Sequence, residues 1–312
     1  MWQHCRLALS APLRFRLGAV LSIGLLTACV SAPVDQIHQF SKSFDAVNAT
    51  GQPLLDDLAI AERALGQKNA RTVLIKGSKD DCLYNKLRTI EVTLGFCARD
   101  AGYFSDIGDP RDTKRFRQGL AVLQSYINLI VALADGKSTS DTVAQANALL
   151  TNVAGLVVLA GGPTAPGLGV ALEALKPLLS DVVNQLSARE ARQLILKSQE
   201  AVSNLIAALH DSAPEVFNVM TTNAETRLGI RQSPTLAADK AKYETYRKIV
   251  ANYCVLLDQL NDAWNETVAA ASTPSPPTIG DLANRAGQLQ ADAAAVSRAY
   301  AVLRTGIVPT KP

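Results

Sequence analysis

Residues 243–264 read YETYRKIVANYCVLLDQLNDAW, and this stretch decides the fold class. Its large apolar side chains recur at alternating steps of three and four residues, which places them along one face of an α-helix. A stripe with this spacing packs against neighbouring helices along a seam. The residues of the stripe are Tyr243, Tyr246, Val250, Tyr253, Leu257, Leu260 and Trp264. The sequence therefore predicts a long helix within a helical bundle.

The same spacing follows this stretch after a proline-rich connection. Residues 272–277 read STPSPP, which cannot continue a helix and is expected to form the turn of an antiparallel hairpin. Thr278 and Asp281 resemble a capping box at the start of the last helix. The apolar positions of that helix are Ile279, Leu282, Ala286, Leu289, Ala293, Val296, Tyr300 and Leu303.

Earlier segments repeat the helical pattern, and only Thr72–Lys76 qualifies as a candidate strand. A helix is expected to end at Gly95 and another near Gly136. The apolar positions are Ile37, Phe40, Phe44 and Val47; Leu54, Leu58, Ala61 and Leu65; Leu83, Leu87, Ile90 and Leu94; Phe116, Leu120, Leu123, Ile127 and Ile130; Leu172, Leu175, Leu179, Val182 and Leu186; Ile195, Val202, Leu205 and Leu209. We therefore predict an all-α fold, an elongated antiparallel helical bundle with coiled-coil-like helix pairs over residues 37–306, with a disordered tail at 307–312.

The first 28 residues have the composition of an export signal. Arg6, Arg14 and Arg16 precede an uncharged apolar run, Leu17–Ala28, and the segment contains no acidic residue. The run is shorter than the roughly 20 residues that span a bilayer, which disfavours a retained transmembrane helix. The sequence therefore predicts a leader that is removed on export.

The leader ends in Leu26-Thr27-Ala28-Cys29, which resembles the lipobox of bacterial lipoproteins at each of its four positions. The resemblance implies cleavage between Ala28 and Cys29 by the lipoprotein signal peptidase, and attachment of diacylglycerol to the Cys29 thiol. An ordinary secretory signal that happens to end in Ala-Cys is the alternative. Residue 30 is Val rather than Asp, which by the sorting pattern of that family implies the periplasmic face of the outer membrane. Residues 29–36 would then form a lipidated tether.

Removing the leader also removes the basic excess of the chain. The whole chain has 31 Lys plus Arg and 28 Asp plus Glu, and the leader contributes three arginines, so 28 of each sign remain. A protein that binds nucleic acid through its phosphates needs a surplus of positive charge. We therefore expect no nucleic-acid partner.

After cleavage, the thiols other than Cys29 are Cys82, Cys97 and Cys254, in a compartment that favours disulfides. A helix over Asp81–Leu94 would hold Cys82 and Cys97 ~20 Å apart at 1.5 Å per residue, whereas a disulfide needs Cα atoms within ~7 Å. This leaves a bridge from Cys254 to either Cys82 or Cys97. Three unpaired buried cysteines are the alternative.

Residues 142–172 contain no charged side chain, and a Gly/Pro-rich turn lies near the middle of this stretch. Two helices buried at the centre of the bundle would explain it. A membrane-inserting hairpin is the alternative, although each arm has too few apolar residues to span a bilayer alone. The preceding Asp135–Thr139 resembles the end of a phosphate-binding loop, but Val131 replaces its first glycine. We interpret it as a helix C-cap followed by an N-cap.

No combination of residues supports catalysis or metal binding. His210, Asp211 and Ser212 are the residue types of a hydrolase triad, but sequence neighbours cannot face one another in that geometry. Asp100, Asp106, Asp109 and Asp112 could surround calcium, but their spacing fits no EF-hand loop. We therefore expect no enzyme, metal or cofactor. The expected function is a binding, scaffolding or envelope-maintenance role with a protein partner, and the alternative is a membrane-active protein that uses residues 142–172.

Overall fold

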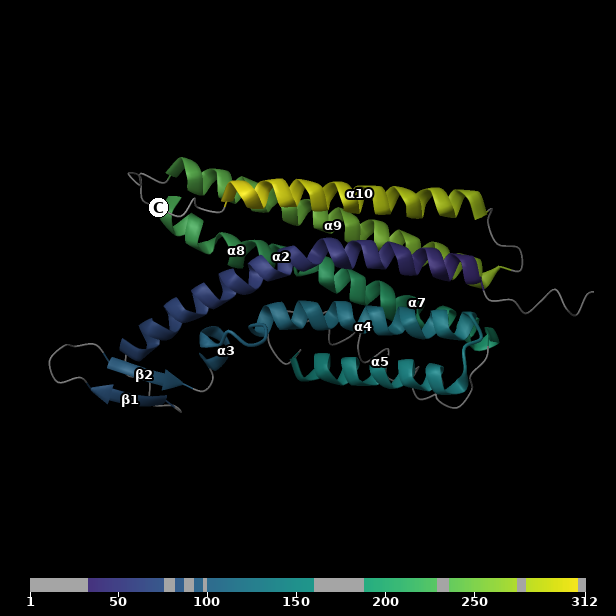
Figure 1. Ribbon diagram of the computed structural model, residues 1–312, viewed down its shortest axis with the longest axis horizontal. Helices are drawn as coiled ribbons and strands as arrows, with labels where there is room; N and C mark the ends of the chain where they lie inside the picture. Colours follow the sequence, from purple (N-terminus) through teal and green to yellow (C-terminus); the bar gives the residue numbers. More distant parts are fainter. Residues whose placement is uncertain are drawn as a thin grey trace, which may run out of the picture.

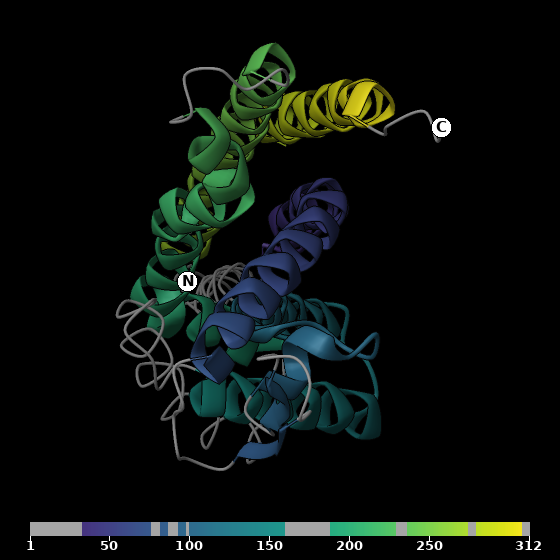
Figure 2. The ribbon, with the colours of Figure 1, turned by 90° about the vertical axis from the view of Figure 1, so that its left-hand side faces the viewer.

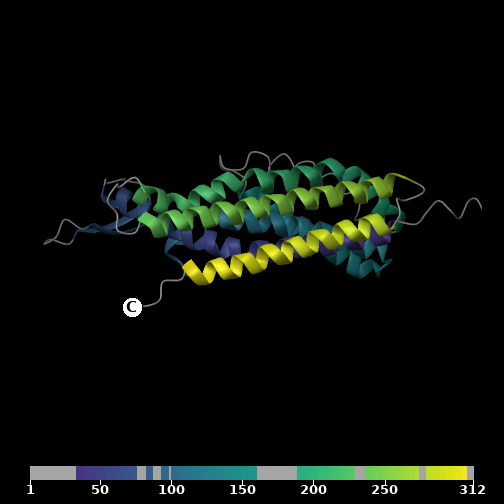
Figure 3. The same ribbon diagram turned by 90° about the horizontal axis from the view of Figure 1, so that it is seen from above.

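The computed structural model describes residues 33–75, 82–86, 93–97, 100–159, 188–228, 236–273 and 279–307. Within these ranges the protein is an elongated helical bundle, which confirms the predicted all-α fold (Figures 1 and 3). The helices are α2 (Val34–Ile75), α3 (Ala101–Phe104), α4 (Arg111–Ala134), α5 (Thr139–Leu159), α7 (Ala188–Asp211), α8 (Ala213–Leu228), α9 (Leu236–Ser272) and α10 (Ile279–Ile307).

The core forms around the apolar stripe of α9. The side chain of Trp264 is fully buried, and its ring contacts those of Phe40 and Tyr126, with centroids 5.2 and 5.7 Å away. Its indole N–H donates to the carbonyl of Gln199 at 3.0 Å, so the buried ring leaves no unsatisfied donor. One side chain of α9 thus joins α2, α4 and α7.

Helix α2 has 42 residues and continues through Gly51 and Pro53. Pro53 removes one hydrogen bond of the helix because it has no N–H group. Burial of the neighbouring Leu54 and Leu55 offsets that loss. Gly51 is required by packing: a Cβ there would lie 2.6 Å from the hydroxyl oxygen of Tyr253.

A β-hairpin lies at the far end of α2, where the sequence predicts helix (Figure 1). Strands β1 (Cys82–Lys86) and β2 (Thr93–Cys97) pair antiparallel, with Leu83 opposite Phe96 and Gly95 opposite Tyr84. The helix expected over Asp81–Leu94 is therefore wrong, because cross-strand pairing overrides a spacing that also fits a helix. The strand expected at Thr72–Lys76 is also wrong, since Thr72–Ile75 is the last turn of α2.

The connection between α4 and α5 confirms the two caps predicted from Asp135–Thr139. Helix α4 ends at Ala134, and Gly136 has a φ of 63°, the left-handed conformation that glycine adopts most readily. The amide of Lys137 donates to the carbonyl of Ala132 at 3.0 Å. The Ser138 hydroxyl then accepts from the amide of Asp141 at 3.2 Å and caps α5.

Helices α5 and α10 occupy opposite edges of the bundle (Figures 1 and 2). Helix α10 packs on α2 and α9, whereas the principal neighbour of α5 within the described ranges is α4. The expectation that the uncharged stretch is buried at the centre is thus wrong for its described part, Thr142 to Leu159. The remainder of that stretch, together with the Gly/Pro-rich turn, lies outside the described residues.

Candidate functional site

The lipidation site that the sequence predicts precedes the described part of the chain. Ala28 and Cys29 lie outside the described residues, and so does the leader. Helix α2 begins at Val34, three residues before the expected start of the bundle at Ile37. The amide of Ile37 donates to the carbonyl of Pro33 at 3.0 Å, which closes the first turn. Only residues 30–33 therefore separate Cys29 from a rigid helix.

The start of α2 lies beside the turn between α4 and α5. The Nε2 atom of His38 is 2.8 Å from the Oδ1 atom of Asp135, and this contact joins the first turn of α2 to the end of α4. Because α5 begins at Thr139, its first turn lies at the same end of the bundle as Val34. An anchor at Cys29 would thus attach close to the start of α5.

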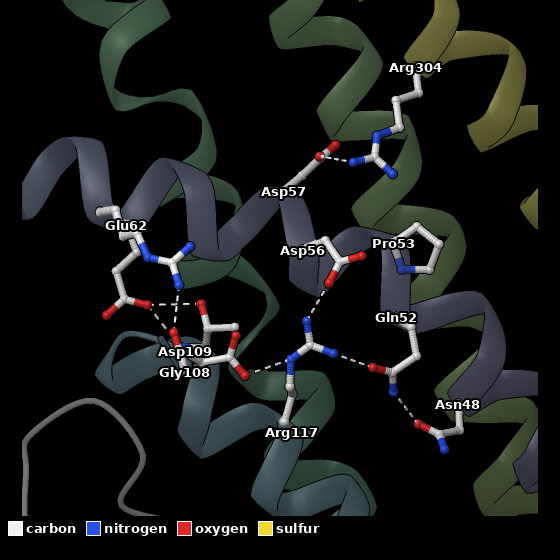
Figure 4. Close-up of polar contacts among 12 residues, drawn as sticks. Asn48, Gln52, Pro53, Asp56, Asp57, Glu62, Gly108, Asp109, Arg117 and Arg304 are labelled. Carbon is white, nitrogen blue, oxygen red and sulfur yellow. Dashed lines mark hydrogen bonds and ion pairs between the residues drawn. The ribbon is translucent and has the colours of Figure 1, made fainter. Parts of the chain in front are cut away.

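A polar cluster holds the loop before α4 against the middle of α2 (Figure 4). The guanidinium of Arg117 in α4 is 2.6 Å from Asp56 and 2.8 Å from Asp109, and it also donates to the side chain of Gln52. Arg63 of α2 donates to the carbonyl of Gly108 at 2.5 Å. These contacts fix the loop, but they also occupy the charged groups that a ligand would need.

Glu62 of α2 caps the start of α4 from across the helix interface. Its carboxylate accepts the amides of Asp112 and Thr113 and the hydroxyl of Thr113, each at 2.9 Å. A carboxylate at a helix N-terminus also interacts favourably with the helix dipole. Burial nevertheless raises the pKa of Glu62, because desolvation outweighs these hydrogen bonds. No local sequence pattern predicts this cap, since Glu62 and Thr113 are far apart along the chain.

The four aspartates considered for calcium do not come together as a cation site. Asp109 pairs with Arg117 and Asp112 with Arg115, the latter at 3.1 Å. Within the described residues, no group of three or more His, Cys, Asp or Glu side chains is placed to hold a metal ion. Asp109 and Asp112 therefore act as partners of arginines.

The cysteines correct the predicted disulfide. Cys97 is disulfide-bonded and Cys254 carries a free thiol, so the bridge expected from Cys254 to Cys82 or Cys97 is wrong. In the hairpin, the Cα atoms of Cys82 and Cys97 are register partners. The distance of ~20 Å expected between Cys82 and Cys97 required the helix that the hairpin replaces. Burial, together with the nearby Asp258, raises the pKa of the half-buried Cys254 thiol and so lowers its reactivity.

The three residues of triad type at the end of α7 do not form a triad. The hydroxyl of Ser212 donates to the carbonyl of Leu209 at 2.7 Å. The ring of His210 instead contacts Asp211 at 3.2 Å and Asp258 of α9 at 3.7 Å. The serine hydroxyl is thus bound to a backbone carbonyl and not to His210, and the histidine links α7 to α9.

Helix α5 is the described helix most suited to a membrane. By length and composition it could cross one, and only 28% of its most apolar window is buried. Its inner face contacts α4 through Leu149, Val153 and Leu156, all buried, while Val158 on the outer face is 81% exposed. Beyond Asp141, the helix thus presents an uncharged surface that the described part of the bundle leaves exposed.

No described protein family, curated protein or solved structure matches the chain. Three features bear on the function: the lipobox-like sequence Leu26-Thr27-Ala28-Cys29, the helix that begins at Val34, and the outer face of α5.

Proposed function

We propose that the chain is a lipid-anchored protein of the bacterial outer membrane, and that its helical bundle faces the periplasm and binds or scaffolds an envelope partner without catalysing a reaction. The observation that carries the proposal is the sequence Leu26-Thr27-Ala28-Cys29 at the end of an apolar leader. Two or three acyl chains, at ~0.8 kcal/mol for each buried methylene group, would hold the bundle to the membrane.

The architecture supports a binding role. The polar clusters of the described residues join helices to one another: Arg117 joins α4 to α2, and Glu62 caps α4. Neither cluster exposes a nucleophile beside a base, since Thr113, whose hydroxyl donates to Glu62, is fully buried. A long bundle with a rigid core instead offers extended helical faces, which are surfaces that partner helices recognise.

Replacement of the lipidated residue tests the proposal. In the Cys29→Ser variant, the protein is expected to leave the membrane fraction, because a serine hydroxyl cannot receive the diacylglycerol. Cys254→Ser is the matched control, since it removes the free thiol of α9 and leaves the lipobox intact. Mass spectrometry of the mature N-terminus should show diacylglycerol on Cys29. An unmodified Cys29, or a leader that remains attached, would refute the anchor.

A membrane-active protein is the second candidate, and the composition of α5 favours it. The helix is uncharged from Thr142 to Leu159, and its principal described neighbour is α4 alone. If α5 inserts, the protein without its lipid should release dye trapped in phospholipid vesicles, and Val158→Glu should reduce the release. Intact vesicles at saturating protein would argue against insertion and leave the scaffold role in place.

A further inference from the structure

The outer face of α5 has a composition unlike that of the other exposed helix surfaces. Its exposed residues after the first turn carry no charge, and most of them lie on the side opposite Leu149 and Val153. They are Ala144, Asn147, Ala148, Leu150, Thr151, Ala154, Val157 and Val158. A surface helix of a globular protein normally places charged residues on this side. The outer face of α5 therefore lacks the charged side chains that normally keep the exposed side of a helix hydrated.

A matched position on α10 shows the contrast. Val302 is 70% exposed, close to the 81% of Val158. Val302 lies between Arg298 and Arg304, whereas the charged residue nearest to Val158 on α5 is Asp141 in the first turn. An isolated exposed valine among charges is ordinary for a protein surface, and an uncharged helix face is not.

The position of α5 relative to the tether supplies the second argument. Cys29 is separated from α2 by residues 30–33, so its Cα atom lies within roughly 18 Å of that of Val34 even if the tether is fully extended at 3.3–3.6 Å per residue. The His38–Asp135 contact places the start of α5 at that end of the bundle. A lipid on Cys29 would therefore hold the bilayer surface within reach of α5.

We propose that the outer face of α5 rests on the phospholipid surface to which the Cys29 lipid attaches, so that the bundle lies on its side. The inference rests on the proposed lipid anchor. It differs from insertion because the contacts between α5 and α4 stay intact and only the outer side chains enter the interface. Helices of this kind bury their apolar face about 5–10 Å into the boundary between headgroups and acyl chains.

Weak affinity is sufficient for such a contact. The outer face of α5 has small apolar side chains and no basic residue after Lys137, so it would bind a membrane poorly from solution. Once the lipid on Cys29 is in the membrane, a tether of a few residues holds α5 at a high effective concentration relative to the same membrane. The outer face of α5 can then stay bound even if its own affinity is low. Asn147 and Thr151 fit this shallow position, since their polar groups can remain hydrated at the interface.

The contrast between Val158 and Val302 gives the test. In a Cys254→Ser background, Val158→Cys or Val302→Cys is labelled with an environment-sensitive fluorophore in the full mature chain. One sample carries the natural lipid in vesicles of phosphatidylethanolamine and phosphatidylglycerol. A second sample replaces Cys29 with Ser and holds the chain to vesicles through an N-terminal histidine tag on a nickel-chelating lipid. Spin-labelled lipids then quench any fluorophore that enters the interface.

The label at 158 should lose most of its emission in both samples, while the label at 302 keeps its emission. Equal quenching at both positions, or none at 158, would overturn the inference. A label at 158 that is already shielded without vesicles would also overturn it, because another part of the chain or a second copy would then cover the face. The tagged sample decides the α5 contact independently of lipidation, and the mass of the natural N-terminus decides the anchor.

Discussion

Helices α5 and α10 are both edge helices, but they meet solvent in different ways. Helix α10 buries Leu289 and Tyr300 and packs on two neighbours. It is tied to α2 through Asp57, which accepts a hydrogen bond from Tyr300 and pairs with Arg304 (Figure 4 shows Asp57 and Arg304). Helix α5 buries Leu149, Val153 and Leu156, packs mainly on α4, and has no charge beyond Asp141. Charged side chains keep the exposed face of an edge helix hydrated. An exposed face without charges is instead suited to contact with another surface.

The difference also concerns attachment. The polar contacts between α5 and α4 include Asn152 with Ser125 at 2.5 Å and Arg115 with the carbonyl of Leu159, also at 2.5 Å. Because α5 has one principal neighbour among the described elements, we expect its local opening to affect α9 and α10 little. Local stability should therefore differ between the two edges even where the buried side chains are alike.

The largest expected loss of stability comes from replacement of Trp264, because its buried ring contacts both α2, on which α10 packs, and α4, on which α5 packs. Trp264→Ala should lower the free energy of unfolding by about 3–5 kcal/mol, because it empties the fully buried site between Phe40 and Tyr126. Urea unfolding followed by circular dichroism measures the change. Trp264→Phe, which keeps an aromatic ring there, should lose much less. A small loss in the alanine variant would mean that the edges do not share this core.

One buried leucine in each edge helix allows the stabilities of α5 and α10 to be compared. Leu149→Ala in α5 and Leu289→Ala in α10 each remove a buried side chain and should cost about 2–5 kcal/mol. Hydrogen exchange should reveal the difference: Leu149→Ala should speed exchange in α5 alone, and Leu289→Ala should speed it in α10, α2 and α9. Leu150→Ala, at an exposed position of α5, is the control. Faster exchange throughout the bundle in Leu149→Ala would contradict the independence of α5.

A pH-dependent effect should follow from Glu62, which supports the helix on which α5 lies. Its pKa is raised above the ordinary value of 4.5 in the folded state, so the folded protein binds this proton more tightly than the unfolded chain does. The stabilising contribution is therefore complete below pH 4.5 and is lost as the pH rises through the folded pKa. Urea titrations over this range should show that loss in the natural protein, whereas Glu62→Gln should lack it. Identical pH profiles would show that Glu62 titrates normally.

The smallest effect concerns two helical glycines. A Cβ at Gly287 of α10 would meet no atom within 4 Å, so Gly287→Ala should stabilise the protein by about 0.5–1 kcal/mol. A Cβ at Gly155 of α5 would lie 3.1 Å from the amide nitrogen of Gln118, which donates to Asn152. Gly155→Ala should therefore gain less or lose stability, as thermal unfolding would show. An equal gain at both sites would mean that Gln118 moves freely.

Secondary structure can be predicted from the sequence where a local pattern fits only one conformation. The stripe from Tyr246 to Trp264 lies in a buried seam, and Gly136 ends α4 where expected. The residues around Leu83 and Leu94 have a spacing that fits either a helix or paired strands, and only contacts with the rest of the protein decide between them. The Glu62 cap and the Arg117 cluster escape prediction because their partners come from distant parts of the chain.

The length of α2 determines how far the hairpin can be from the lipid. With 42 residues at 1.5 Å each, the helix is about 63 Å long, and it runs without interruption from the tether to the β-hairpin (Figure 1). A bundle that stood upright would hold the hairpin at that height above the bilayer, whereas a bundle lying along α5 would keep it near the headgroups. The distance between the hairpin and the bilayer would thus report the orientation of the bundle, either perpendicular to the membrane and extended into the compartment or parallel to the membrane surface.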